Sequence, residues 1–183
     1  MGYPGAVSLL DGYKATYIAT SDYQTLAASC TDFFQMFWNS KTVRILEIYV
    51  SMKDTGASQT FNTISLYKRT AGNSVAGTSS TFGNITKMDS GNAANDASPK
   101  IFSANPTVGA GTMITTVTLP SYTTGFTGTV SNSPGDFCIF KANNMAQALV
   151  LKASNEGVAL SLGGSTQAGS SPKTRVTVVW TEE

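Results

Sequence analysis

Hydrophobic and polar residues alternate along most of this chain, and clusters of Gly, Asn, Pro and Ser interrupt the alternation. Alternation with a period of two is typical of β-strands with one buried face, and the interrupting residues are typical of turns. The clearest examples are residues 42–53 (TVRILEIYVSMK) and 173–181 (KTRVTVVWT). Almost nothing has the periodicity of a helix, so the pattern predicts an all-β fold.

The expected strands are short and separated by turn signals. Residues 42–53 and 61–69 flank a turn and are expected to pair as a hairpin or meander, and 155–157 is expected to be a tight hairpin turn. Pro120 is expected to end its strand. Residues 70–99 are expected to form a long loop, functional or disordered, with short strands at most. The expected strands are 14–19, 33–38, 42–53, 61–69, 100–103, 113–119, 125–130, 136–141, 148–153, 158–162 and 173–181.

About nine to eleven such strands fit two packed sheets. We therefore expect a single two-sheet β-sandwich, jelly-roll-like, over residues 14–183. The first 13 residues contain Pro4 and three glycines and are expected to form an extended N-terminal arm. We expect the strand 173–181 to be paired well inside a sheet and the aromatic segment 33–38 to belong to the core. On the strand 42–53, the residues expected to share the buried face are Leu46, Ile48, Val50 and Met52.

The composition narrows the classes of partner. Charged residues make up 13% of the chain, about half of the ~25% usual in soluble domains. The 12 basic and 11 acidic residues leave a net charge of +1, which provides no attraction for nucleic acid or an anionic membrane. The N-terminal residues have no charged region followed by an apolar one. We therefore expect no signal peptide, no membrane span, and synthesis in a cytoplasm.

The chain contains no histidine, which removes the commonest general base and the histidine metal ligand. The two cysteines, Cys30 and Cys138, form no CxxC pair and cannot build a structural zinc site. We expect both to be buried free thiols, and a long-range disulfide is the alternative. No phosphate-binding or dinucleotide-binding glycine motif is present. The sequence predicts no cofactor, no metal and no small-molecule substrate.

The carboxylates offer the remaining routes to chemistry. Asp89 and Asp96 lie in an Asn-rich loop that could hold calcium, although the spacing does not match a calcium loop and the residue types suit ordinary turns. Glu47 and Glu156 could form a glycosidase pair, but nothing in the sequence brings them together. Glu182 and Glu183 end the chain and are expected to be solvated. These observations favour a protein that is not an enzyme.

Tyrosines crowd the first 25 residues, at positions 3, 13, 17 and 23. Tyrosine is common at interface hot spots, and glycine and proline suit a detached arm, so we expect this segment to dock onto a partner. The alternative is that the rings pack on the chain's own sheets. The residues expected to contact a partner are Tyr3, Pro4, Leu9, Leu10 and Tyr13.

Several segments occur in an order that is similar to one group of phage proteins. They are TVRILEIYVSMK (42–53), ISLYKRTAGNSVAGTSS (64–80), Asp89-Ser90 with its Ala-rich continuation, FSANPTVG (102–109) and VTVVWTEE (176–183). Over residues 42–183 the chain resembles small virion structural proteins encoded near the capsid genes of tailed bacteriophages. The loop after Asp89, which is unusually rich in Asn and Ala, departs from that pattern.

The resemblance implies a β-sandwich or jelly-roll subunit on the capsid surface of a virion. Such decoration or cement proteins bind the lattice of the major capsid protein, and they are often homotrimers at local three-fold positions. No catalytic residue comes with the resemblance. The alternative is a carbohydrate-binding or receptor-binding module of a phage fibre or tail, which the tyrosines and the Asn/Asp loops motivate. A two-carboxylate hydrolase is the least supported reading.

Overall fold

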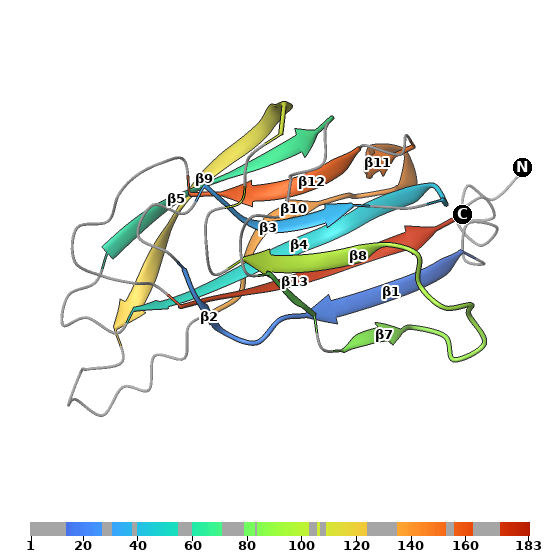
Figure 1. Ribbon diagram of the computed structural model, residues 1–183, viewed down its shortest axis with the longest axis horizontal. Helices are drawn as coiled ribbons and strands as arrows, with labels where there is room; N and C mark the ends of the chain where they lie inside the picture. Colours follow the sequence, from blue (N-terminus) through green and yellow to red (C-terminus); the bar gives the residue numbers. More distant parts are fainter. Residues whose placement is uncertain are drawn as a thin grey trace, which may run out of the picture.

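The protein is described by a computed structural model that covers residues 14–26, 31–37, 40–54, 60–70, 79–82, 84–102, 106, 109–123, 135–152, 156–162 and 173–183. Within these ranges the regular structure consists of thirteen β-strands and one 3-10 turn, Met145–Gln147. The strands form two antiparallel sheets with the arrangement of a β-sandwich (Figure 1). The predicted all-β fold with two sheets is confirmed. The expected arm, 1–13, and the expected strand 125–130 lie outside the described residues.

The first sheet, called sheet A, has the strand order β7-β1-β13-β4. Strand β2 also pairs with β13, and β10 and β11 both pair with β4. The strands of sheet A are β1 (Ala15–Thr20), β2 (Gln24–Thr25), β4 (Val43–Asp54), β7 (Ile85–Lys87), β10 (Phe137–Lys141), β11 (Leu149–Leu151) and β13 (Lys173–Glu182).

The second sheet, called sheet B, has the strand order β6-β8-β3-β12-β5-β9. A short parallel pairing joins it to sheet A, with Lys53 of β4 opposite Tyr122 of β9. In Figure 1 the ends of β4 and β9 meet at the left of the molecule. The strands of sheet B are β3 (Asp32–Phe37), β5 (Thr60–Arg69), β6 (Ser79–Thr81), β8 (Ser98–Phe102), β9 (Gly111–Thr123) and β12 (Gly157–Ser161).

Three expectations about connections and strand ends are wrong. Strands β4 and β5 lie in different sheets, and so do β11 and β12, so neither pair is a hairpin. Alternation shows that a strand has a buried face, but it does not show which sheet the strand joins. Strand β9 continues through Pro120 to Thr123. A proline is tolerated there because β9 is an edge strand, where the missing N–H can face away from the neighbour.

Strand β13 lies in the middle of sheet A, as its regular alternation predicted. It pairs with β4 over its whole length, with β1 over residues 177–182, and with β2 at Lys173 and Thr174. Val176, Val178 and Trp180 are completely buried on one face. The Trp180 ring is stacked on Tyr17 of β1, with 5.5 Å between the ring centroids.

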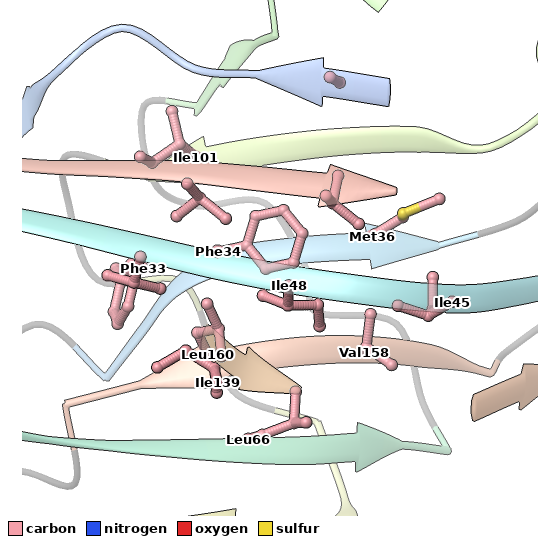
Figure 2. Packing of buried hydrophobic residues seen from close by; sticks show 14 of the residues in the cluster. Phe33, Phe34, Met36, Ile45, Ile48, Leu66, Ile101, Ile139, Val158 and Leu160 are labelled. Carbon is pink, nitrogen blue, oxygen red and sulfur yellow. The ribbon is translucent and has the colours of Figure 1, made fainter. Parts of the chain in front are cut away.

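The core is one cluster of apolar side chains contributed by both sheets (Figure 2). Sheet A provides Ile45 and Ile48 from β4, and sheet B provides Leu66 and Leu160 from β5 and β12. These side chains are completely buried. At about 25 cal/mol per Å² of apolar area removed from water, this burial is the main favourable contribution to folding.

A β-bulge in β4 changes which of its residues reach the core. Val179 pairs with Glu47 and Trp180 pairs with Ile45, so Leu46 is the extra residue. A bulge resets the alternation of a strand, because two residues oppose one. Ile45 is therefore completely buried and Leu46 is only partly buried, which corrects the expected core face.

A second bulge resets the alternation of β3. Ser161 pairs with Asp32 and Leu160 pairs with Phe34, so Phe33 is the extra residue. Phe33 and Phe34 both join the core as a result, which confirms the expectation for these two residues, whereas Phe37 is only partly buried and Trp38 lies outside the described residues. Asp32 and Gln35 come to the same face, and the Gln35 amide lies 3.4 Å from the Asp32 carboxylate.

The close packing of Phe37 on Gly157 gives a test of the pairing between β3 and β12. A Cβ atom at Gly157 would lie 2.4 Å from the Phe37 ring, so Gly157→Ala would push the ring out of place. We expect a loss of about 1–3 kcal/mol in the free energy of unfolding, measured by urea denaturation. Gly135→Ala is the control, because no atom lies within 4 Å of the new Cβ there. Equal stabilities of the two variants would contradict the described packing.

Candidate functional site

The residues predicted to contact a partner lie outside the described part of the chain. They are Tyr3, Pro4, Leu9, Leu10 and Tyr13, and their prediction stays untested. Two other tyrosines of the same region, Tyr17 and Tyr23, are described. Both pack on the chain's own sheets, which is the alternative rather than the favoured reading for these two.

Glu182 is a buried carboxylate that binds three separate segments. Its side chain has no exposed area, although we expected it to be solvated. It accepts hydrogen bonds from the backbone N–H groups of Asp96 (2.8 Å) and Ala97 (3.0 Å) and from the Trp180 indole N–H (3.0 Å). Lys41 Nζ lies 3.3 Å away. These charge-assisted bonds offset the cost of removing the carboxylate from water.

Asp96 extends this arrangement to the link between β3 and β4. Its carboxylate accepts hydrogen bonds from the backbone N–H groups of Ser40 (2.6 Å) and Lys41 (3.1 Å) and from the Ser40 hydroxyl (3.2 Å). The Tyr17 hydroxyl donates to the carbonyl of Ala93 at 3.0 Å. The loop between β7 and β8 is therefore fixed to both sheets at one end of the sandwich. We call Glu182, Asp96 and Lys41 the carboxylate clamp.

One of the two aspartates that could have held calcium, Asp96, belongs to the clamp. Asp96 is occupied by backbone donors, and Asp89 accepts a hydrogen bond of 2.9 Å from the Gly91 N–H in a local turn. Among the described residues, no group of three or more Cys, Asp or Glu side chains is placed to hold a metal ion. The geometry of Asp89 matches the ordinary-turn reading, whereas Asp96 binds the β3–β4 link, which is distant in the sequence.

Glu47 and Glu156 have separate lysine partners. Glu47 of β4 lies 3.1 Å from Lys141 Nζ and accepts a hydrogen bond of 2.9 Å from the Tyr49 hydroxyl. Glu156 precedes β12, lies 3.1 Å from Lys68 Nζ and accepts a hydrogen bond of 2.7 Å from the Lys152 N–H. Each carboxylate thus belongs to a local ion pair with its own lysine.

The exposed face of sheet A carries a cluster around Tyr23. The Tyr23 hydroxyl is hydrogen-bonded to the Ser51 hydroxyl at 2.8 Å, and Lys53 Nζ lies 4.0 Å from the ring centroid. The guanidinium of Arg175 lies 5.1 Å from the same ring and forms an ion pair of 2.9 Å with Asp136. These contacts fix the segment before β2 against β4 and β13.

Cys138 does not fit the expectation of two buried thiols. It is a free thiol and it is exposed on β10. Strand β10 lies at the margin of sheet A, where β4 is its one partner among the described strands. The position of Cys30 lies outside the described residues.

Sheet B contains a buried ion pair between Asp32 and Arg69. Two guanidinium nitrogens of Arg69 contact the carboxylate, at 2.6 and 3.1 Å, and a third donates to the carbonyl of Gly109 at 3.2 Å. The guanidinium also lies 4.2 Å over the Tyr67 ring. The bulge at Phe33 makes this pair possible, because it turns Asp32 toward the Gln35 face.

Exposed apolar side chains gather on the two-stranded ribbon formed by β5 and β9. The described residues include four large hydrophobic side chains classed as exposed, and three belong to this ribbon: Phe61 (67%), Met113 (55%) and Ile114 (40%). Ile114 is the extra residue of a bulge in β9. The chain has no charged residue between Lys100 and Asp136, so β9 carries none. We call the exposed surface of β5 and β9 the β5–β9 ribbon.

Strand β9 is also the longest exposed sheet edge of the described chain. Sheet B ends at β6 and β9, and sheet A ends on one side at β7. Strands β6 and β7 have three residues each, whereas β9 has thirteen. Short or charged edge strands are common protections against unwanted pairing, and β9 has neither feature. Such an edge suits strand addition by another polypeptide.

Comparison of the chain with known protein families, curated proteins and solved structures finds no match. Within the described residues no helix has the length and hydropathy needed to cross a membrane. The functional interpretation therefore depends on the geometry of the chain itself.

Two features of the site, the burial of Glu182 and the lack of charge on β9, have a signal in the amino-acid sequence. Glu182 has the same parity on β13 as Val176, Val178 and Trp180, so alternation alone places it on the buried face. The absence of charged residues from 101 to 135 identifies the segment that contains β9. The Asp32–Arg69 pair had no such signal, because it depends on a bulge and on strands distant in the sequence.

Replacing Glu182 tests the clamp. In Glu182→Gln an amide NH₂ would face N–H donors, so we expect a loss of about 2–4 kcal/mol in the free energy of unfolding. The control is Glu183→Gln, because Glu183 is partly exposed beside Lys14 and Arg44 and should contribute below about 1 kcal/mol. Chemical denaturation measures both. A loss no larger for Glu182→Gln than for the control would contradict the clamp.

The Glu47 ion pair predicts a dependence on pH. Hydrogen bonds from Lys141 and Tyr49 hold the pKa of Glu47 below its usual value of 4.5. A lowered folded-state pKa gives stability that is present above the unfolded-state value and lost as pH falls through the folded one. The stability difference between wild type and Glu47→Gln should therefore shrink below about pH 4.5. Urea titrations between neutral and acidic pH measure this. A constant difference would count against the pair.

Proposed function

We propose that this protein is a non-enzymatic structural subunit of a tailed-bacteriophage virion that binds the lattice of the major capsid protein and stabilises the head. The observation that carries the proposal is the β5–β9 ribbon, a partly apolar surface whose outer strand β9 carries no charge and has a long free sheet edge. A subunit that adds to a shell needs a surface of this kind, which can accept strand addition and apolar contact.

The polar clusters support a structural role. The carboxylates of Glu182, Asp96 and Asp32 bind backbone N–H groups or a buried guanidinium, and Glu47 and Glu156 pair with lysines. These interactions fix loops to sheets. The low content of charge also suits a protein that works in an assembly rather than as a free, self-repelling molecule. The resemblance to small virion proteins implies that the assembly is a phage virion and that the subunit is a homotrimer.

The alternative, a carbohydrate-binding or receptor-binding module, is less well supported. Two of the side chains that motivated it have internal roles: Tyr17 is completely buried, and Asp96 belongs to the clamp. The exposed Phe61 beside the hydroxyls of Thr63 and Thr118 is the surface that would serve such a module.

Binding to assembled heads is the direct test of the proposal. Purified protein is mixed with heads of the phage that encodes it, assembled without this subunit, and sedimented. We expect saturable binding at a fixed ratio to the major capsid protein, because each lattice position offers one equivalent site. Heads of an unrelated phage are the control. Absence of binding, or equal binding to both heads, would overturn the proposal, and a hit on a glycan array would then favour the alternative.

A further inference from the structure

Strand β9 offers a regular free edge of limited length. The bulge at Ile114 disturbs the ladder at one end, and Pro120, which has no N–H, ends it at the other. Beyond Pro120 the pairing of β9 with β4 begins, at Tyr122. The regular free stretch is therefore residues 115–119, with Val117 at its centre. Among the described residues, no strand pairs with this edge.

We propose that two copies of this chain associate by pairing their β9 strands antiparallel across a two-fold axis at Val117. This register aligns the whole regular stretch of each copy. Thr116 of one copy lies opposite Thr118 of the other, and Val117 lies opposite itself. Cross-strand pairs of β-branched residues and of threonines are favourable in antiparallel sheets. Sheet B of each copy then continues into sheet B of the other.

Charge and apolar surface both favour a second copy as the occupant. Because β9 has no charged residue, a two-fold contact brings no like charges together. The bulged Ile114, 40% exposed, comes opposite Pro120 of the second copy, so an exposed apolar side chain gains an apolar neighbour. An overlap of this size buries a small area, and the dimer should therefore depend strongly on concentration.

The inference goes beyond the proposed function and does not require it, because it concerns only the chain's contact with itself. A two-fold contact at β9 does not use the edges at β6 or β7. It could therefore link one homotrimer to another if the trimer implied by the resemblance exists. Failure of head binding would leave self-association intact, and loss of self-association would leave head binding to be measured separately.

A matched pair of threonine variants tests the contact. Thr118→Lys places two like charges beside the two-fold axis, whereas Thr86→Lys places the same charge on β7, the exposed edge of sheet A. In sedimentation velocity over a concentration series, the parent and Thr86→Lys should show an even-numbered assembly. Thr118→Lys should raise its dissociation constant roughly tenfold or more. Far-ultraviolet circular dichroism checks that each variant is folded.

A cysteine cross-link tests the register independently of the charge variants. In a Cys138→Ser background, Val117→Cys faces its own copy at the 4.5–5.5 Å Cα separation typical of antiparallel pairs, which is within disulfide range. Oxidation should give covalent dimers. Thr112→Cys, exposed on the same strand but away from the axis, should not. A parent without even-numbered assemblies, an unchanged Thr118→Lys, or equal cross-linking at both positions would overturn the proposal.

Discussion

The buried carboxylate of Glu182 is the interaction on which one end of the sandwich depends. A charge removed from water costs several kcal/mol unless donors surround it, and here the donors come from the loop before β8, from the β3–β4 link and from Trp180. The carboxylate also fixes the register of β13. A slip of one residue would turn Glu182 and Trp180 toward solvent together, so the register with both neighbouring strands is strongly specified.

Bulges decide which polar side chains meet. Without the bulge at Phe33, a regular strand would place Asp32 on the core face with Phe34 and separate it from Arg69. Without the bulge at Leu46, a regular ladder would place Leu46 instead of Ile45 opposite Trp180. The bulge at Phe33 thus permits a polar contact, and the bulge at Leu46 a core contact, that regular strands would not make.

The fold class and most strands could be predicted from the sequence, because alternation is local. Strand β13 and the burial of Val176 and Val178 follow directly from it. The pairing partners of the strands could not be predicted, because the turn signal after residue 54 is compatible with a hairpin and with a connection between two sheets. For the candidate site, the lack of charge around β9 can be predicted from the sequence. Its position at the end of a sheet depends on the order of six strands from distant parts of the chain.

The central place of β13 has a consequence for how the protein is made. Ala15 of β1 is paired with Glu182, and β4 gains its long partner only when residues 173–182 are present. During synthesis from the N-terminus, β1 and β4 therefore emerge from the ribosome long before the strand that separates them. Sheet A must remain incomplete until translation has passed residue 182. Such high contact order makes folding slow, and for that interval β1 and β4 lack the strand that pairs with both of them.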